Sequence, residues 1–191
     1  MVSRFNPRLI CICAWLRLRK LELGEGAVSA FLSTVTSKID SKGRISVPAA
    51  FRSVAVSQGF NGIYLYPSFT ESAIEGGGQV LMDSVSQMLA QIDPYTDESG
   101  ALSTALFADS YQMHFDGDGR ISIPEMLLDH AGIDKGLIFV GLGAKFQIWN
   151  PEKFAIYREA AREKARQHRG LLRSLSPTPP MPPPASGQGD K

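Results

Sequence analysis

A nine-residue repeat constrains the fold of this chain more than any other feature. Segment 40–48, DSKGRISVP, returns 76 positions later as segment 116–124, DGDGRISIP, and six of the nine residues are identical. Each copy starts with turn chemistry, because aspartate accepts hydrogen bonds from turn amides and glycine readily adopts a positive φ. Each copy ends in proline, which suits the first turn of a helix. The chain is therefore predicted to consist of two related halves.

Each half is predicted to begin with a β-hairpin followed by a short helix. Residues 34–39 and 44–47 alternate between polar and apolar side chains, as the two strands of a hairpin with charge at its tip would. Pro48 should open a helix that runs to about residue 56, with Phe51 facing inward. The second half repeats this plan, with Pro124 opening its helix.

One half alone is too small to fold stably. Gly132 closes the second helix, and the apolar runs 62–66 and 136–140 predict one more strand in each half. A unit of about 40 residues buries too little apolar surface to be stable by itself. The halves must share a core, and two equivalent hairpins packed into a closed or nearly closed barrel would also hide their strand edges. The predicted class is α+β, with flanking helices and a pseudo-twofold relation within one chain.

Between the halves the pattern favours helices. Ser68 and Glu71 form a capping-box pattern, and the glycines at 76–78 break the chain. Apolar residues then recur at helical spacing from residue 81 to residue 92, before Pro94.

After the second half, residues 145–149 predict a last strand, and Asn150 with Pro151 predicts the cap of a long helix. From Ser174 onward the chain is rich in proline, and we expect a disordered tail. The predicted segments are an N-terminal extension (1–30), a first repeat (31–80), connecting helices (81–109), a second repeat (110–153), and a basic helix with a proline-rich tail (154–191).

These residues resemble the MraZ family, within the AbrB/SpoVT-like group of bacterial DNA-binding proteins. The resemblance covers about residues 31–153 and rests on the paired Asp-x-x-Gly-Arg turns, on Lys38-Ile39, and on the strings at 130–132, 140–141 and 146–149. It implies a fold of two swapped-hairpin, AbrB-like barrel motifs in one chain and assembly into a ring-shaped homo-oligomer. It also implies binding to short direct repeats in double-stranded DNA upstream of the family's own gene in the division and cell-wall cluster.

Residues 1 to about 27 have no counterpart in that family. The apolar run at 9–16 superficially resembles a signal peptide, but Trp15 lies in it and no small-residue cleavage site follows. We expect either an unstructured extension or an upstream start codon, with Val28 or a neighbouring residue as the true start.

The charge distribution argues against non-specific attraction to a polyanion. The 191 residues carry 20 basic and 19 acidic side chains, so the formal charge is +1. The segment 31–150 holds seven basic and thirteen acidic residues and would repel DNA wherever its charge is evenly spread. Only a focused group of cations can therefore bind DNA. No apolar run approaches the roughly 20 residues that span a bilayer, and we expect a cytoplasmic, nucleoid-associated protein.

The chain lacks a recognisable catalytic or metal-binding pattern. The string 141–143 begins a dinucleotide fingerprint, but Phe146 stands where its third glycine belongs. Cys11 and Cys13 are too close together for an ordinary zinc pair without partners, and the three histidines are scattered. We expect no enzyme activity, no cofactor and no metal.

The first turn is the predicted DNA contact, through Lys38, Lys42 and Arg44. Arginine can hold guanine O6 and N7 with two hydrogen bonds, while lysine supplies charge for phosphates. In the alternative interpretation, Asp40 and Arg44 simply pair to hold the turn, with Gly43 supplying its positive φ.

The second turn is predicted to be structural, through Asp116, Gly119 and Arg120. An approaching anion would meet Asp118 before Arg120, so repulsion should dominate there. A calcium loop is disfavoured, because the EF-hand pattern would require glutamate where Leu127 stands.

The C-terminal segment carries arginines at 158, 162, 166, 169 and 173, which a helix would place along one face. Arg158, Arg162 and Arg166 are candidate phosphate contacts. The alternative is a solvated face in which Glu159 and Glu163 supply local ion pairs.

Together with the family resemblance, these patterns favour a sequence-specific DNA-binding transcriptional regulator, and the resemblance implies that it acts as an oligomer on its own gene cluster. The main alternative is an oligomeric scaffold that binds protein partners, without DNA, through its acidic surface and its arginine-rich helix.

Overall fold

The computed structural model describes residues 30–174, and its centre is a six-stranded antiparallel sheet. In spatial order, its strands are β1 (Thr34–Lys38), β7 (Gly136–Gly141), β8 (Phe146–Trp149), β4 (Ala73–Gly77), β3 (Gly62–Pro67) and β5 (Tyr111–His114). A two-stranded ribbon of β2 (Arg44–Ser46) and β6 (Arg120–Ser122) contacts the outer strands β1 and β5. The expectations for the N-terminal extension and the proline-rich tail fall outside the described residues.

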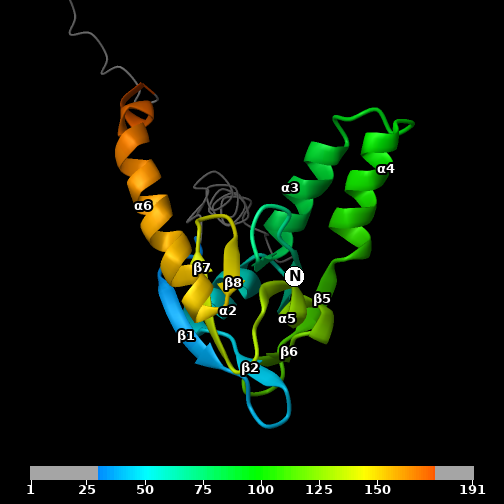
Figure 1. The fold of residues 1–191 in the computed structure, drawn as a ribbon. Coiled ribbons are helices and arrows are strands. Elements are labelled where there is room, and N and C mark those ends of the chain that lie inside the picture. The colour runs from blue at the N-terminus through cyan, green and yellow to red at the C-terminus, as the bar shows by residue number, and fades with distance from the viewer. Residues whose placement is uncertain (1–29, 175–191) are drawn as a thin grey trace, which may run out of the picture.

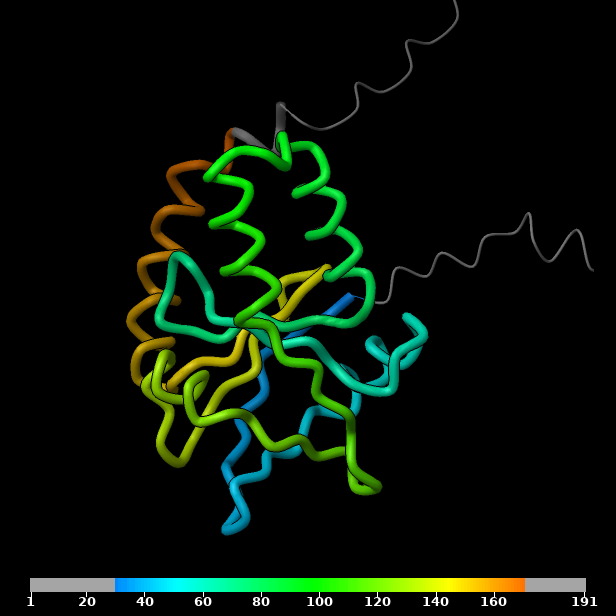
Figure 2. Tube along the Cα trace, turned by 90° about the vertical axis from the view of Figure 1, so that its right-hand side faces the viewer, coloured from blue at the N-terminus to red at the C-terminus, as the bar shows by residue number. Residues whose placement is uncertain are grey.

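Helices flank this sheet. They are α2 (Ala49–Ser57), α3 (Gln79–Leu89), α4 (Asp97–Ser103), the π-helical turn η1 (Thr104–Ala108), α5 (Glu125–Ala131) and α6 (Pro151–Ser174). We call the α3, α4 and η1 unit, residues 79–108, the helical arm. The arm and α6 project from opposite sides of the body, both away from the repeated turns (Figures 1 and 2). The α+β class is confirmed.

The short helices of the two repeats form where the prolines predict them. Pro48 directly precedes α2, and Pro124 directly precedes α5. Phe51 is fully buried, as predicted. Gly132 ends α5 with φ +66°, a conformation that glycine adopts without the strain of a Cβ. Local chemistry therefore determines both ends of α5 and the start of α2.

The predicted local hairpins form only at their tips. The two strands predicted on either side of the first turn share a single bridge, between Ile39 and Ile45. Beyond it, β1 pairs with β7 and β2 pairs with β6, so each strand finds its partner in the other repeat. The reason is hydrophobic: a three-residue strand buries little alone, whereas Ile45 and Ile121 lie directly opposite each other in the ribbon and are both buried.

The predicted capping box at Ser68 and Glu71 is wrong. The segment that follows is strand β4, whose five residues are all buried. The Ser68 amide donates to the Ala73 carbonyl, and the Ser68 hydroxyl donates to the Glu75 carboxylate, so this serine closes the β3–β4 turn instead of capping a helix.

The glycines predicted as a chain break also belong in part to β4. A Cβ on Gly76 would lie 2.6 Å from the Phe146 ring, so the close approach of strand and ring requires glycine there. The helix predicted from residue 81 is confirmed as α3, which ends at Leu89, before the predicted residue 92.

The core joins both repeats. Four phenylalanine rings pack with centroid distances of 5.0–5.9 Å. They are Phe31, three residues before β1, Phe51 in α2, Phe139 in β7 and Phe146 in β8. All four are fully buried, and most pairs meet edge to face. Neither half could build this cluster alone, which confirms that the halves share a core.

The last strand and the long helix form as predicted. Asn150 caps α6, since its Oδ1 accepts from the amides of Glu152 (2.9 Å) and Lys153 (3.4 Å). Its Nδ2 also donates to the Gly132 carbonyl at 2.7 Å, which ties the start of α6 to the end of α5.

Replacing Phe146 tests the shared core. Phe146→Ala removes one ring from the four-ring cluster and leaves a cavity, so we expect the free energy of unfolding to fall by about 3–5 kcal/mol. Chemical denaturation at one fixed protein concentration measures the change, because association would alter apparent stability. Phe69→Ala is the control: Phe69 is exposed, and its loss should change stability by less than about 0.5 kcal/mol. Equal effects of the two substitutions would contradict the assigned core.

Candidate nucleic-acid interface

The first turn is organised by a single carboxylate. Asp40 Oδ1 accepts hydrogen bonds from the backbone amides of Lys42 and Arg44, both at 2.8 Å. The Gly43 amide donates to the Asp40 carbonyl at 3.0 Å, and Gly43 has φ +74°. An aspartate at this position therefore replaces the water that the turn amides would otherwise bind, and it stiffens the loop.

The second turn repeats this geometry closely. Asp116 Oδ1 accepts from the amides of Asp118 (2.9 Å) and Arg120 (2.8 Å), and Gly119 has φ +73°. The sequence identity of the two copies thus reflects identical hydrogen bonding. The structural roles of Asp40, Gly43 and their counterparts in the second turn stay predictions, and these hydrogen bonds are the contacts through which the residues would hold the turns.

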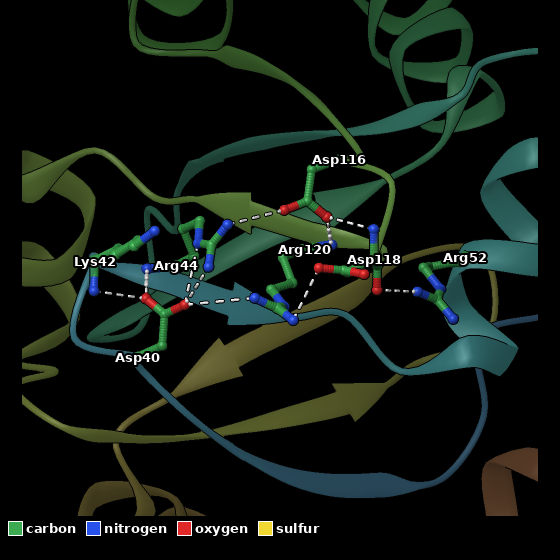
Figure 3. A network of polar contacts seen from close by, with 7 residues as sticks. All are labelled: Asp40, Lys42, Arg44, Arg52, Asp116, Asp118 and Arg120. Atoms are coloured by element: carbon green, nitrogen blue, oxygen red, sulfur yellow. Dashed lines mark hydrogen bonds and ion pairs between the residues drawn. The ribbon is translucent and has the colours of Figure 1, made fainter.

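The two turns are also joined to each other (Figure 3). Arg44 donates to Asp40 Oδ2 from Nε at 3.0 Å and lies 3.4 Å from Asp116 Oδ2 through Nη1. Arg120 pairs with Asp118 at 2.9 Å and approaches Asp40 at 3.8 Å. Each arginine thus contacts an aspartate of the other repeat. Pairing of β2 with β6 makes this possible, because it brings the two turns to the same end of the molecule (Figure 2).

Arg52 extends this network and was missed in the sequence analysis. It lies on α2 of the first repeat, and its Nη1 donates to the Asp118 carbonyl of the second turn at 3.0 Å. A carbonyl acceptor leaves no mark in the sequence, so only the fold could reveal this contact. Arg52 places a fourth cation among the residues of Figure 3, against three carboxylates.

Lys42 and Lys38 differ from the arginines. Both are exposed, and Lys42 projects from the first turn (Figure 3). Within residues 30–174, no carboxylate lies within ion-pair distance of either ammonium group. Of the three predicted DNA contacts, the two lysines are therefore accessible, while Arg44 is already held by Asp40 and Asp116.

The other candidate phosphate contacts lie elsewhere. Arg158, Arg162 and Arg166 are on α6, which extends away from the turns (Figure 1). Arg162 pairs with Glu159 at 3.3 Å, and Arg166 pairs with Glu163 at 3.1 Å. The structure thus forms the local ion pairs of the alternative interpretation and does not bring these arginines into the turn network.

The aspartates of the turns have perturbed acidity. The backbone hydrogen bond from Arg44, assisted by the Lys42 amide and the Arg44 guanidinium, lowers the pKa of Asp40 below its ordinary value of 3.8. The backbone hydrogen bond from Arg120 similarly lowers the pKa of Asp116, with help from the Asp118 amide and the charges of Arg120 and Arg44. Both carboxylates therefore stay ionised at neutral pH.

A second polar network lies within the sheet. The Glu75 carboxylate accepts from Lys145 Nζ (2.6 Å) and from the hydroxyls of Tyr66 (3.0 Å) and Ser68 (3.1 Å), and from Gln147 Nε2 (3.2 Å). Burial opposes ionisation, but the bonds and charge of Lys145, with Tyr66 and Gln147, lower the pKa of Glu75 overall. Because the partners lie in or directly beside the neighbouring strands β3 and β8, we assign this network to sheet register.

The described residues offer no metal site or membrane-spanning helix. Within residues 30–174, no group of histidine, cysteine, aspartate and glutamate side chains could hold a metal ion. Among the helices of the same residues, none has both the length and the hydropathy that crossing a bilayer requires.

Known proteins are similar to most of this chain. The family model described as "MraZ protein, putative antitoxin-like" matches residues 106–173. A transcriptional regulator MraZ from Parvibaculum lavamentivorans is 40% identical over 148 residues, which cover 77% of this chain and 92% of that protein. The chain belongs to the MraZ family. A Rickettsia bellii relative of the same name is 40% identical over 150 residues, covering 78% of this chain and all of that protein. A third, from Methylocella silvestris, is 39% identical over 156 residues, covering 82% of this chain and 95% of that protein.

Membership confirms the resemblance predicted from the repeated turns. The relatives are named as regulators of transcription, not as enzymes, which supports a regulatory role for this chain.

The lowered pKa values of Asp40 and Asp116 predict that the stability of the fold depends on pH. A carboxyl whose pKa is lowered on folding adds stability above its ordinary value of 3.8, and this stability is lost as the pH falls through the lowered value. We expect Asp40 and Asp116 to titrate below 3.8 in carbon-detected NMR. In the double variant Asp40→Asn/Asp116→Asn, the free energy of unfolding should fall less steeply than in wild type as the pH is lowered into the acidic range.

Asp134→Asn is the matched control, because Asp134 is exposed and lies outside both turns. A titration of Asp40 or Asp116 at or above 3.8 would contradict the network, and so would an equally steep fall in the double variant and in wild type.

Proposed function

We propose that this chain is a sequence-specific DNA-binding transcriptional regulator. It acts as a ring-shaped homo-oligomer on short direct repeats upstream of its own division and cell-wall gene cluster. The observation that carries the proposal is the joined pair of turns, a stiff tip with accessible lysines at its end. The family membership of the chain supports the same role.

The lysines make the first contact in this proposal. An exposed ammonium without a carboxylate partner can approach a phosphate at no cost in broken ion pairs. Lys38 lies on β1 opposite Gly136, at the end of the strand that leads into the turn, and Lys42 lies within the turn. The two charges therefore flank the loop that would enter a groove, and they concentrate positive potential on a body that is acidic overall.

Arg44 reads a base in the same proposal, although Asp40 and Asp116 hold it in the free protein. Its side chain is 29% exposed and contacts both carboxylates, so DNA has to replace these ion pairs when Arg44 turns to a base. A bidentate contact with guanine is worth about 1–3 kcal/mol of discrimination against the wrong base. In this proposal the carboxylates keep the guanidinium oriented until DNA arrives.

The barrel is inferred from the same cross-repeat pairing. Each repeat contributes the strand after its turn to a ribbon with the other repeat, and that ribbon contacts both outer strands of the sheet. This exchange supports a swapped-hairpin, AbrB-like barrel with pseudo-twofold symmetry, in which the segments 31–80 and 110–153 are the two motifs.

Oligomerisation supplies the affinity that one tip lacks. Three carboxylates share the tip with its cations, so a single tip should bind weakly. When several subunits engage successive repeats, each further contact occurs at a high effective concentration and raises avidity without new chemistry. A tightly binding monomer, measured by light scattering together with DNA titration, would contradict this mechanism.

A scaffold without DNA binding is the second candidate. The pairing of Arg44 with two carboxylates favours it, because that geometry also suits a purely structural turn. DNA binding separates the two proposals.

Lys42 provides the first test. Lys42→Ala should weaken binding to the DNA upstream of the gene and reduce the slope of log affinity against log salt by about one unit, because one phosphate contact is lost. Fluorescence anisotropy at several salt concentrations measures this slope. Lys164→Ala, which removes an exposed lysine of α6, should leave it unchanged. Equal slopes for wild type and Lys42→Ala would refute the phosphate contact.

Arg44 provides the test of base reading. Arg44→Ala should abolish discrimination between the upstream repeats and scrambled DNA, which removes about 1–3 kcal/mol of preference, while light scattering finds the oligomer intact. Arg120→Ala is the matched change in the second turn, where Asp118 disfavours DNA, and it should retain the preference. Wild-type discrimination by Arg44→Ala in a gel shift would exclude the contact.

A further inference from the structure

The helical arm carries negative charge that no nearby cation offsets. Between Arg52 and Arg120 the sequence contains no lysine or arginine. The arm lies within this stretch, and its helices and connection expose four acidic side chains, Asp83, Asp93, Asp97 and Glu98. The arm is therefore an acidic surface.

The arm also exposes large apolar side chains. Tyr95, in the connection between α3 and α4, is 96% exposed, and Met88, in the last turn of α3, is 60% exposed. The end of α3 and its connection to α4 form the outer end of the arm (Figure 1), and Tyr95 lies two residues from both Asp93 and Asp97 in the sequence. An apolar end bordered by carboxylates is typical of a contact surface.

The opposite side of the molecule has the complementary character. A groove of about 270 Å³ lies between α6 and the end of β7, and Arg158 and Arg162 border it. Its other lining residues are almost all apolar: Val140, Leu142, Gln147, Phe154, Tyr157, Ala161 and Ala165. Leu142 is 50% exposed at its mouth. This side therefore offers an apolar groove with a basic rim.

The groove suits a protein better than a nucleic acid. A duplex would present phosphates to a lining with almost no polar surface, whereas an apolar arm end would fill it. Arg162 on the groove rim already pairs with Glu159, and Arg166 further along α6 pairs with Glu163, which weakens their attraction for phosphate.

We propose that the helical arm of one copy docks into the groove beside α6 of the next copy. The helical arm and α6 project from opposite sides of one molecule (Figure 1), so the end of the arm and the groove beside α6 belong to different surfaces. A contact between different faces leaves one of each free, so it propagates and closes into a ring if the rotation per subunit allows. This inference rests on the proposed function, which includes the ring, and it identifies the two surfaces through which neighbouring subunits of the ring would contact each other. The turns stay free, because both faces point away from them.

Charge reversal on each face tests the contact in the full-length chain. Arg158→Glu/Arg162→Glu makes the groove rim acidic, and Asp97→Lys/Glu98→Lys makes the arm basic. Each double variant should lower the mass measured by light scattering toward that of a monomer and raise the dissociation constant at least tenfold. All four substitutions in one chain should restore the wild-type mass, as should an equimolar mixture of the two double variants. Lys135→Glu, an exposed reversal outside both faces, should leave the mass unchanged.

Asp97 and Glu98 lie in the first turn of α4, where acidic residues stabilise the helix, so replacing them by lysine also weakens α4. Tyr95→Ser tests the same surface without that change. This exposed residue can be replaced without loss of buried contacts, and the variant should also dissociate, with an unchanged circular dichroism spectrum.

Several results would overturn the inference. One is a wild-type mass for either charge-reversal variant or for Tyr95→Ser. Another is failure of the fourfold variant to recover the wild-type mass. A third is a groove variant that keeps the wild-type mass but loses the salt dependence of its DNA binding. The last result would assign α6 to phosphate contact. A wild-type ring that does not bind DNA would refute the proposed function. The contact between arm and groove would then still hold if the two charge-reversal variants dissociate, and it would fail if they keep the wild-type mass.

Discussion

The antiparallel pairing of β2 with β6 is the constraint on which the rest of the structure depends. Each strand has only three residues, and each places one isoleucine inward against its counterpart, Ile45 against Ile121. The alternation of a strand then forces the residues on either side of the isoleucine outward. Arg44 and Arg120 consequently emerge from the same face of the ribbon, within reach of aspartates from both repeats. One hydrophobic pair thus fixes the electrostatic network above it.

This network couples two opposing requirements. The turns need an aspartate to bind their amides, yet each aspartate reduces the positive potential that the proposed DNA binding requires. The copies resolve the conflict differently: the first turn adds Lys42 and the second adds Asp118 at the equivalent position. Since the hydrogen bonds of the turns are otherwise the same, the duplicated motif retains its structure in both copies while only one copy gains a surplus cation. Arg52 partly compensates the second turn by bonding to the Asp118 carbonyl.

Features determined by nearby residues could be predicted from the sequence, and features determined by distant partners could not. Some elements depend on contacts within about four residues, and the sequence therefore predicts them. They are the Asp-x-x-Gly turns, the helices after Pro48 and Pro124, and the Asn150 cap. The partner of β2 depends on burial of an isoleucine 76 positions away, and the contact of Arg52 depends on a carbonyl 66 positions away. Ser68 shows how a local pattern misleads. Its hydroxyl could cap a helix, but Glu75 accepts its bond because β4 pairs with both β3 and β8.

In the proposed mechanism, the placement of the elements separates DNA recognition from assembly. The turns lie at one end of the body, while α6 and the helical arm extend from the other (Figures 1 and 2). The shared phenylalanine core lies between them and joins the strands that lead to each end. Because packed interiors deform little, subunits joined through the helices would hold their turns at fixed spacing. A fixed spacing favours DNA whose repeats recur with the same period, so selectivity would come from the period of the repeats as well as from the bases that each tip contacts.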